Sequence, residues 1–249
     1  MTMTQHNNMI KKQPLGIVQS RGLGDIVIAL PIARYFHDQG HEVHWPICAE
    51  FIPHVENHVP WVHWHPVTTD SGSFFYDQPL KILTQLNCDD VICLYQALTG
   101  HKFHEELYFQ HTKFDQYKYI KANVPFLNKW KLNECITRNL EKEQALYDRL
   151  VKNSNYAVIH LEGSDHRAKF DPSIIPTEWQ TIEINSKETA SIFDWLTVLE
   201  SAQSIVCVDS VFANLVDQLS IGTDRYFIPR SHIGLTPVQG QDWTWVKFE

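Results

Sequence analysis

A glycine-rich turn carries the first residues whose types and spacing could do chemistry. Residues 21–25, Arg-Gly-Leu-Gly-Asp, lie between an apolar run, 15–20, and apolar residues at helical spacing. Glycines in such a turn permit positive φ and let a ligand or another backbone come close. The start of the helix also offers free N–H groups to an anion. Val27 replaces the third glycine of the dinucleotide fingerprint, which disfavours an NAD enzyme.

Asp25, the last residue of this turn, has two interpretations. Aspartate is a favoured N-cap residue, so Asp25 could do no more than cap the helix that follows. A carboxylate at the mouth of a parallel sheet could instead act as a general base. Residue spacing alone does not separate the two roles.

A second set of candidate residues lies in the C-terminal half. Asp209 and Ser210 follow an apolar strand, 204–208, and open a helix, while Arg167 and Lys169 lie in a polar loop after another strand. A helix N-terminus and long cationic side chains together can bind a phosphate. The alternatives are that Asp209 and Ser210 only cap their helix and that the two cations are solvated loop charges. Residues 230–232, Arg-Ser-His, follow the last strand and could face the same site.

Strands and helices alternate in both halves of the chain, which predicts an α/β fold. Residues 1–14 are polar and are expected to be a loose tail. We predict one lobe at 15–131 and a second at 132–249, without an order of elements for 95–131. The predicted strands are 15–20, 41–46, 61–65, 90–94, 156–161, 179–184, 204–208 and 225–228. The predicted helices follow Asp25 up to Gly40 and span 49–57, 78–87, 134–152 and 189–202, and a last helix opens at Asp209-Ser210 and runs through Leu219.

The first motif resembles the opening of the ADP-heptose:lipopolysaccharide heptosyltransferases, glycosyltransferase family 9, which are inverting GT-B enzymes. The likeness rests on Gly22-Leu-Gly-Asp25 and on Pro31, six residues after the aspartate. Segment 44–51 is similar to the family's second strand and the short helix after it. Segment 202–215 is similar to the family's signature of an apolar strand, Asp-Thr or Asp-Ser, three residues, a histidine and a leucine.

This resemblance implies two Rossmann-like lobes whose parallel sheets face a cleft. It implies an inverting, metal-independent transferase that moves a sugar from a nucleotide diphosphate donor to a hydroxyl of a glycan or glycolipid, with no cofactor. Asp25 would be the general base, and the acceptor side of the cleft would include Arg21, Gly22 and Gly24. The donor would be held by Arg167, Lys169, Asp209, Ser210, Val211 and Asn214.

The chain also departs from the family pattern. Asn214 stands where the family usually has histidine, and the position of a family lysine falls near Arg167 or Lys169, so that an arginine could replace it. The chain is shorter than a typical member, with the difference falling in the middle and at the C-terminal end. These departures affect the donor contacts and the acceptor region first.

Composition and charge disfavour several classes of function. The formal net charge of −8 disfavours a broad surface for nucleic acid. No apolar run approaches the length of a membrane-spanning helix, so at most peripheral membrane contact is expected. The N-terminus lacks the pattern of a signal peptide, so we expect a soluble, cytoplasmic protein. The five cysteines include no CxxC pair and are expected to be reduced thiols.

Histidine is abundant, with fourteen residues, but the spacing of these residues does not predict a metal site. His54 and His58 lie four apart without the HExxH pattern, and His63 and His65 alternate along a strand. We therefore expect no metal. Two other functions stay open: a GT-B-like sugar-nucleotide epimerase, and a non-catalytic protein that binds a nucleotide sugar or a partner. A transferase acting on nucleic acid is a remote fourth hypothesis.

Overall fold

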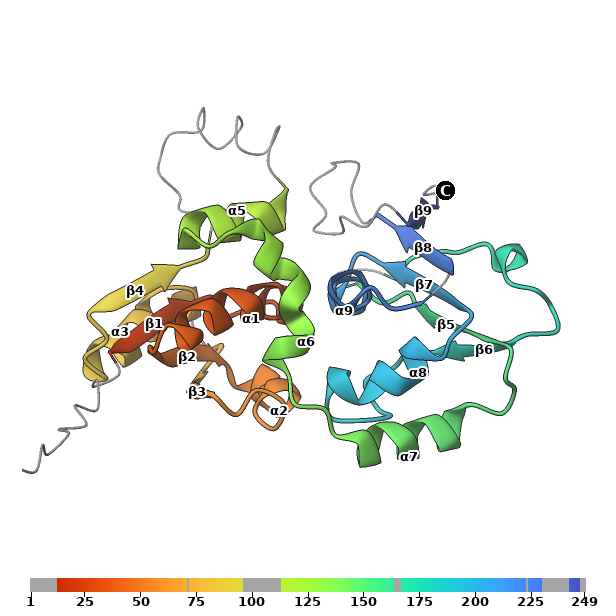
Figure 1. Cartoon of the computed structure of the whole chain (residues 1–249), viewed down its shortest axis with the longest axis horizontal. Coiled ribbons are helices and arrows are strands. Elements are labelled where there is room, and N and C mark those ends of the chain that lie inside the picture. The colour runs from red at the N-terminus through yellow and green to blue at the C-terminus, as the bar shows by residue number, and fades with distance from the viewer. Residues whose placement is uncertain are drawn as a thin grey trace, which may run out of the picture.

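The computed structural model describes residues 13–70, 72–95, 113–163, 167–222, 224–229 and 242–246. Within these ranges the chain forms two separate parallel sheets that lie side by side (Figure 1). The strand orders are β3-β2-β1-β4 and β6-β5-β7-β8-β9. The α/β fold with two Rossmann-like lobes is therefore confirmed. No helix in the described part of the chain is both long and apolar enough to cross a membrane.

The first lobe is built on the four-stranded sheet. Its strands are β1 (Pro14–Val18), β2 (Glu42–Cys48), β3 (Val62–Val67) and β4 (Asp90–Cys93). The connecting helices are α1 (Leu23–Asp38), α2 (Ile52–Val55) and α3 (Asp77–Gln85), with 3-10 turns at Ala49–Phe51 and Gly72–Phe74. Because the strands are parallel, their carboxyl ends share one edge, and the glycine-rich turn after β1 lies at that edge.

The second lobe is built on the five-stranded sheet. Its strands are β5 (Tyr156–His160), β6 (Gln180–Glu183), β7 (Ser204–Val208), β8 (Asp224–Ile228) and β9 (Trp243–Trp245). Its helices are α7 (Leu140–Leu150), α8 (Leu196–Glu200) and α9 (Val211–Leu219), with 3-10 turns at Pro172–Ile174 and Ile192–Trp195. Between β4 and α7 the chain forms α5 (Phe114–Ala122), a 3-10 helix (Phe126–Lys131) and α6 (Leu132–Cys135).

Three predicted boundaries are wrong. The single helix predicted at 134–152 is two helices, because the Asn139 side chain accepts a hydrogen bond from Lys142 N and caps α7 after an extended break. The helix predicted at 189–202 is shorter and begins as a 3-10 turn at Ile192, which the Ser191 side chain caps. Pro14, predicted to end the tail, is the first residue of β1, and residues 1–12 lie outside the described ranges.

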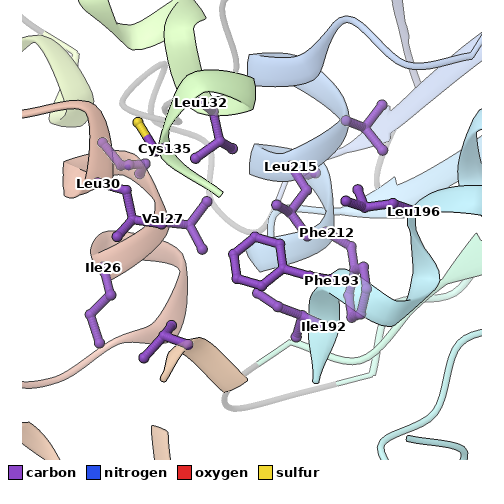
Figure 2. Packing of buried hydrophobic residues seen from close by; sticks show 14 of the residues in the cluster. Ile26, Val27, Leu30, Leu132, Cys135, Ile192, Phe193, Leu196, Phe212 and Leu215 are labelled. Atoms are coloured by element: carbon purple, nitrogen blue, oxygen red, sulfur yellow. The ribbon is translucent and has the colours of Figure 1, made fainter. Parts of the chain in front are cut away.

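The two lobes share one hydrophobic core. A single cluster of buried residues runs from the first sheet through α1 to α9 and the second sheet. Figure 2 shows its centre, where α1 faces α9, α6 and the turn before α8. The labelled contributors are Ile26, Val27, Leu30, Leu132, Cys135, Ile192, Phe193, Leu196, Phe212 and Leu215. The lobes are thus packed against each other at α1 and α9.

A buried charge cluster also joins the lobes. Lys129 Nζ lies 2.7 Å from Asp115 Oδ2 on α5 and 2.8 Å from Asp217 Oδ2 on α9, and all three side chains are fully buried. Trp243 Nε1 donates to Asp217 Oδ1 at 3.1 Å. Burial lowers the pKa of Lys113, while both carboxylates oppose that shift, so Lys113 is within electrostatic reach of the cluster. Buried charges need partners of this kind, and here the partners come from both lobes.

Candidate functional site

The glycine-rich turn positions Asp25 differently from the simple capping interpretation. Gly22, not Asp25, is the N-cap of α1, and its φ of 83° is a conformation that favours glycine. Asp25 is the third residue of the helix. A Cβ on Gly22 would collide with Asp25 Oδ2, so the carboxylate lies over the glycine. The Asp25 carboxylate therefore sits at the N-terminus of α1, where the helix dipole favours negative charge.

A hydroxyl network fixes the turn itself. Arg21 N donates to the Tyr95 hydroxyl at 2.8 Å, and Ser20 Oγ donates to Phe74 O at 2.5 Å. Because Ser20 Oγ has only one proton, the Tyr95 hydroxyl donates to Ser20 Oγ, at 2.9 Å. Burial raises the pKa of Tyr95 to about 12, so this hydroxyl stays protonated at neutral pH. The Arg21 guanidinium lies over the Phe74 ring, 5.2 Å from its centroid.

Lys118 is a site residue that the sequence analysis missed. It lies on α5 with its side chain 1% exposed, and its Nζ is 3.4 Å from Asp25 Oδ1. Lys118 Nζ also donates to Gln19 Oε1 at 2.5 Å and to Leu94 O at 3.5 Å. Burial lowers the pKa of Lys118, and the Asp25 carboxylate opposes that shift. An ammonium with three acceptors is fully engaged, so Lys118 orients Asp25.

A cavity of about 300 Å³ opens beside this pair. Its polar lining residues are Gln19, Asp25 and Lys118. Its aromatic lining residues are Phe75, Tyr76, Tyr95 and Phe114. Concave sites lined by aromatic residues with a few polar groups are typical ligand pockets.

The N-terminus of α9 is the counterpart in the second lobe. Ser210 is its N-cap, but the Ser210 side chain accepts no hydrogen bond from the first N–H groups of the helix. The Ser210 hydroxyl is instead 2.9 Å from His160 Nδ1, at the end of β5. Asp209 N donates to Ile228 O at 3.0 Å and extends the β7–β8 pairing up to the turn. A helix start of this kind is suited to a phosphate.

His160 was not singled out by the sequence analysis, and it gives the site a pH dependence. Burial lowers the pKa of His160 from 6.5 to about 4. As the pH falls below 6.5 the unfolded chain takes up a proton that the folded chain refuses, so the free energy of unfolding decreases until about pH 4. A shift of this size is worth about 3 kcal/mol at most.

We expect His160→Gln to lose this part of the acid sensitivity. The stability advantage of the wild-type chain over the variant should shrink by up to about 3 kcal/mol between pH 7 and pH 4. Urea titrations of both proteins at several pH values measure it. Titration of other histidines is common to both proteins and cancels in the difference. Parallel stability profiles would show that His160 titrates normally.

The two lobes meet closely at Gly24. A Cβ on Gly24 would lie 3.2 Å from Asn214 Nδ2 and 3.6 Å from Val211 Cα, so the start of α1 touches the start of α9. Asn214 is buried, and its Nδ2 donates to Ser210 O at 3.0 Å. Its Oδ1 is buried with no hydrogen-bond partner in the described structure. The structure thus brings the glycine-rich turn and the second motif together.

Arg167 lies in the same lobe, but other side chains already engage it. Its guanidinium forms ion pairs with Glu162 and Glu183 and is half exposed. The positive charge of Arg167 contributes to lowering the pKa of His160, so Arg167 lies within electrostatic reach of that residue. His160 in turn contacts Ser210 at the start of α9. Lys169 is exposed two residues later. Residues 230–232 lie outside the described ranges.

A histidine cluster lies on the first sheet, away from these residues. His44 Nδ1 is 3.1 Å from His65 Nε2, and His63 Nε2 is 3.2 Å from Glu42 Oε1. Burial lowers the pKa values of His44 and His65. Within the described ranges, no group of three or more His, Cys, Asp or Glu side chains has the geometry to hold a metal ion.

Neither the known protein families nor the curated proteins include a match to this sequence. Solved structures do match its fold. A glycosyltransferase family 9 protein from Veillonella parvula DSM 2008 is 11% identical, with a TM-score of 0.58 over 94% of this chain and 86% of that chain. The ADP-heptose lps heptosyltransferase II of E. coli is 11% identical, with a TM-score of 0.54 over 94% of this chain and 90% of that one.

A third match is the iron-containing dodecameric glycosyltransferase TibC from enterotoxigenic E. coli H10407. It is 10% identical, with a TM-score of 0.56 over 96% of this chain. The chain spans only 63% of the length of TibC. At these identities the likeness concerns the fold, and this chain has the two-lobed α/β fold of glycosyltransferase family 9 structures.

Proposed function

We propose that this protein is an inverting, metal-independent glycosyltransferase that uses a nucleotide diphosphate sugar and a hydroxyl acceptor. The observation that carries the proposal is the contact at Gly24, where the start of α1, with Asp25, meets the start of α9. In this proposal the general base belongs to one lobe and the phosphate-binding helix end to the other, and the Gly24 contact supports their proximity. The fold, shared with glycosyltransferases, supports the same assignment.

In this proposal Asp25 accepts the proton of the acceptor hydroxyl as its oxygen attacks the anomeric carbon. The bond between that carbon and the diphosphate oxygen breaks, and the nucleoside diphosphate leaves from the opposite face, which inverts the configuration. Lys118 holds the carboxylate in place through the 3.4 Å contact. The cavity beside Asp25 takes the acceptor, with Arg21, Gly22 and Gly24 at its edge.

The donor diphosphate is assigned to the second lobe. N–H groups at the start of α9, including that of Val211, and the Ser210 hydroxyl would bind phosphate oxygens. Asp209 and Asn214 would border the donor, and Arg167 and Lys169 would approach it after Arg167 leaves its glutamates. Because this neutralisation uses protein groups, transfer should withstand a chelator. TibC, which is described as iron-containing, makes the chelator test worthwhile.

We assign residues 15–131 to the acceptor lobe and 132–249 to the donor lobe. A boundary in this region is supported by the membership of the two sheets. The last strand of the first sheet, β4, ends at Cys93, and the first strand of the second sheet, β5, begins at Tyr156. The acceptor would be a glycan or glycolipid hydroxyl, and the compartment would be the cytoplasm. The test of the whole proposal is sugar transfer from a panel of nucleotide diphosphate sugars, including ADP-heptose, which is bound in a structure of TibC.

Donor binding gives a separate prediction. Ser210→Ala and Arg167→Ala should each weaken nucleotide-sugar affinity about tenfold to a hundredfold, as loss of one hydrogen bond to a charged group does. Lys187→Ala is the matched control, since Lys187 is an exposed cation of the same lobe. Thermal shift and calorimetric titration measure the affinity. Unchanged affinity in both site variants would place the donor elsewhere.

One alternative is supported by specific observations. Arg167 is occupied by Glu162 and Glu183, and Asn214 is tucked against Ser210 O. Both features leave fewer side-chain groups for a donor diphosphate, and they favour a non-catalytic protein that binds a nucleotide sugar or a partner only. Saturable donor binding with no donor turnover under any acceptor would support this alternative. Turnover without an acceptor would instead indicate a sugar-nucleotide epimerase or hydrolase.

A further inference from the structure

The side chains that line the cavity beside Asp25 indicate which class of acceptor it would bind. Four aromatic side chains, Phe75, Tyr76, Tyr95 and Phe114, line it together with the carboxylate. The rings of Phe75 and Tyr95 are 5.3 Å apart, and those of Tyr76 and Tyr95 are 5.4 Å apart, both edge to face. These contacts hold the rings in place before any ligand arrives. Phe75 nevertheless remains 38% exposed, so part of its surface is free to contact a ligand.

The charges around the cavity work against an anionic ligand. Asp25 is 25% exposed, and it is the acidic side chain among the described residues that line the cavity. Lys118 is buried and is engaged by Gln19, Asp25 and Leu94. A phosphate or carboxylate brought here would meet the Asp25 carboxylate, while the Lys118 ammonium already has three acceptors.

A sugar ring matches the aromatic and polar side chains that line the cavity. One face of a pyranose presents C–H groups that pack on an aromatic ring by dispersion, while its hydroxyls bond carboxylate and hydroxyl groups. A volume of about 300 Å³ is at the lower end for ligand pockets, which fits one ring rather than an extended chain. Tyr76, Tyr95 and Gln19, which carry uncharged polar groups, line the same cavity.

From these observations we infer that the cavity binds an uncharged pyranose ring, stacked on Phe75 and its neighbouring rings, with one hydroxyl directed at Asp25. The inference rests on the proposed function, because it takes this cavity as the acceptor side. It adds that the cavity binds neutral glycosides more tightly than acceptors that carry a phosphate or carboxylate on the reacting sugar. Specificity then arises from Asp25 and the aromatic wall together.

Ligand-observed NMR titration of the full chain, without any donor, tests the inference. The probes are methyl glycosides of glucose, galactose and mannose, compared with glucose 6-phosphate and methyl glucuronide. We expect at least one neutral glycoside to bind about tenfold more tightly than either anionic sugar. Phe75→Ala should weaken that binding about tenfold. Leu80→Ala, which removes an exposed apolar side chain outside the cavity wall, should leave binding unchanged.

The inference is overturned if an anionic sugar binds as tightly as the neutral ones, if no neutral glycoside binds, or if Phe75→Ala and Leu80→Ala behave alike. Its failure is distinct from that of the proposed function. Transfer of sugar only to phosphorylated acceptors would refute the neutral pocket and keep the transferase. Neutral binding at Phe75 without donor turnover would keep the pocket and refute the transferase.

Discussion

Replacing Asp25 by asparagine is expected to lower the rate of sugar transfer at least about a hundredfold, because a positioned general base contributes about 10² to 10⁴ in rate. Donor affinity should stay within about twofold of wild type, since the donor is assigned to α9, in the other lobe. The measurement is the initial rate of transfer at saturating donor, together with calorimetric titration of that donor.

The buried ammonium of Lys118 affects the stability of the Asp25→Asn variant. Asparagine keeps the shape of the side chain but removes the counter-charge of an ammonium that is 1% exposed. The Asp25→Asn chain should therefore be less stable than wild type, even though Asp25 is not the N-cap. The double variant Asp25→Asn/Lys118→Met removes both charges. It should regain stability without regaining transfer.

The double variant makes the test decisive. A low rate caused by poor folding would recover with stability, whereas the loss of a base would not. Lys118→Met alone keeps the carboxylate but frees its orientation, so it should lower the rate with unchanged donor affinity. If Asp25→Asn transfers sugar at the wild-type rate, Asp25 serves only the helix start and its lysine partner.

The two motif regions of the site could be predicted because each is local in sequence. A strand, a turn of small residues and a helix appear within 15–40 and again within 204–219, and parallel strands bring such turns to the same edge of a sheet. The sequence could not show that Gly24 touches Val211 and Asn214, because that contact joins the two lobes. It also could not show that the Glu162 and Glu183 side chains engage Arg167.

The position of Lys118 in the site could not be predicted from the sequence, for a different reason. It lies within 95–131, where aromatic, basic and apolar residues mix without a clear period, so its burial could not be read from spacing. Its bond to Gln19 spans 99 residues of sequence. A lysine on a short helix is normally exposed, and only tertiary packing makes this one part of the site. His160 is similar, since the last residue of a buried strand is usually a packing residue.

The largest expected effect on stability comes from Lys129. In Lys129→Met the side chain keeps most of its length and apolar packing but loses its charge and its donors. Asp115 and Asp217 then face each other inside the protein without the shared ammonium. Breaking a buried ion pair by removing one partner costs about 3 to 5 kcal/mol. We expect a loss of that size in the free energy of unfolding, measured by urea denaturation.

Two controls separate this network from general packing. Lys131→Met changes an exposed lysine of the same 3-10 helix and should alter stability by less than about 0.5 kcal/mol. The triple variant Asp115→Asn/Lys129→Met/Asp217→Asn removes all three charges and should recover most of the loss, because uncharged buried groups do not carry the desolvation cost of carboxylates that have lost their shared ammonium. A triple variant as unstable as Lys129→Met would show that packing, not charge, fixes α5 to α9. Since those helices belong to different lobes, recovery would identify the network as an electrostatic tie between them.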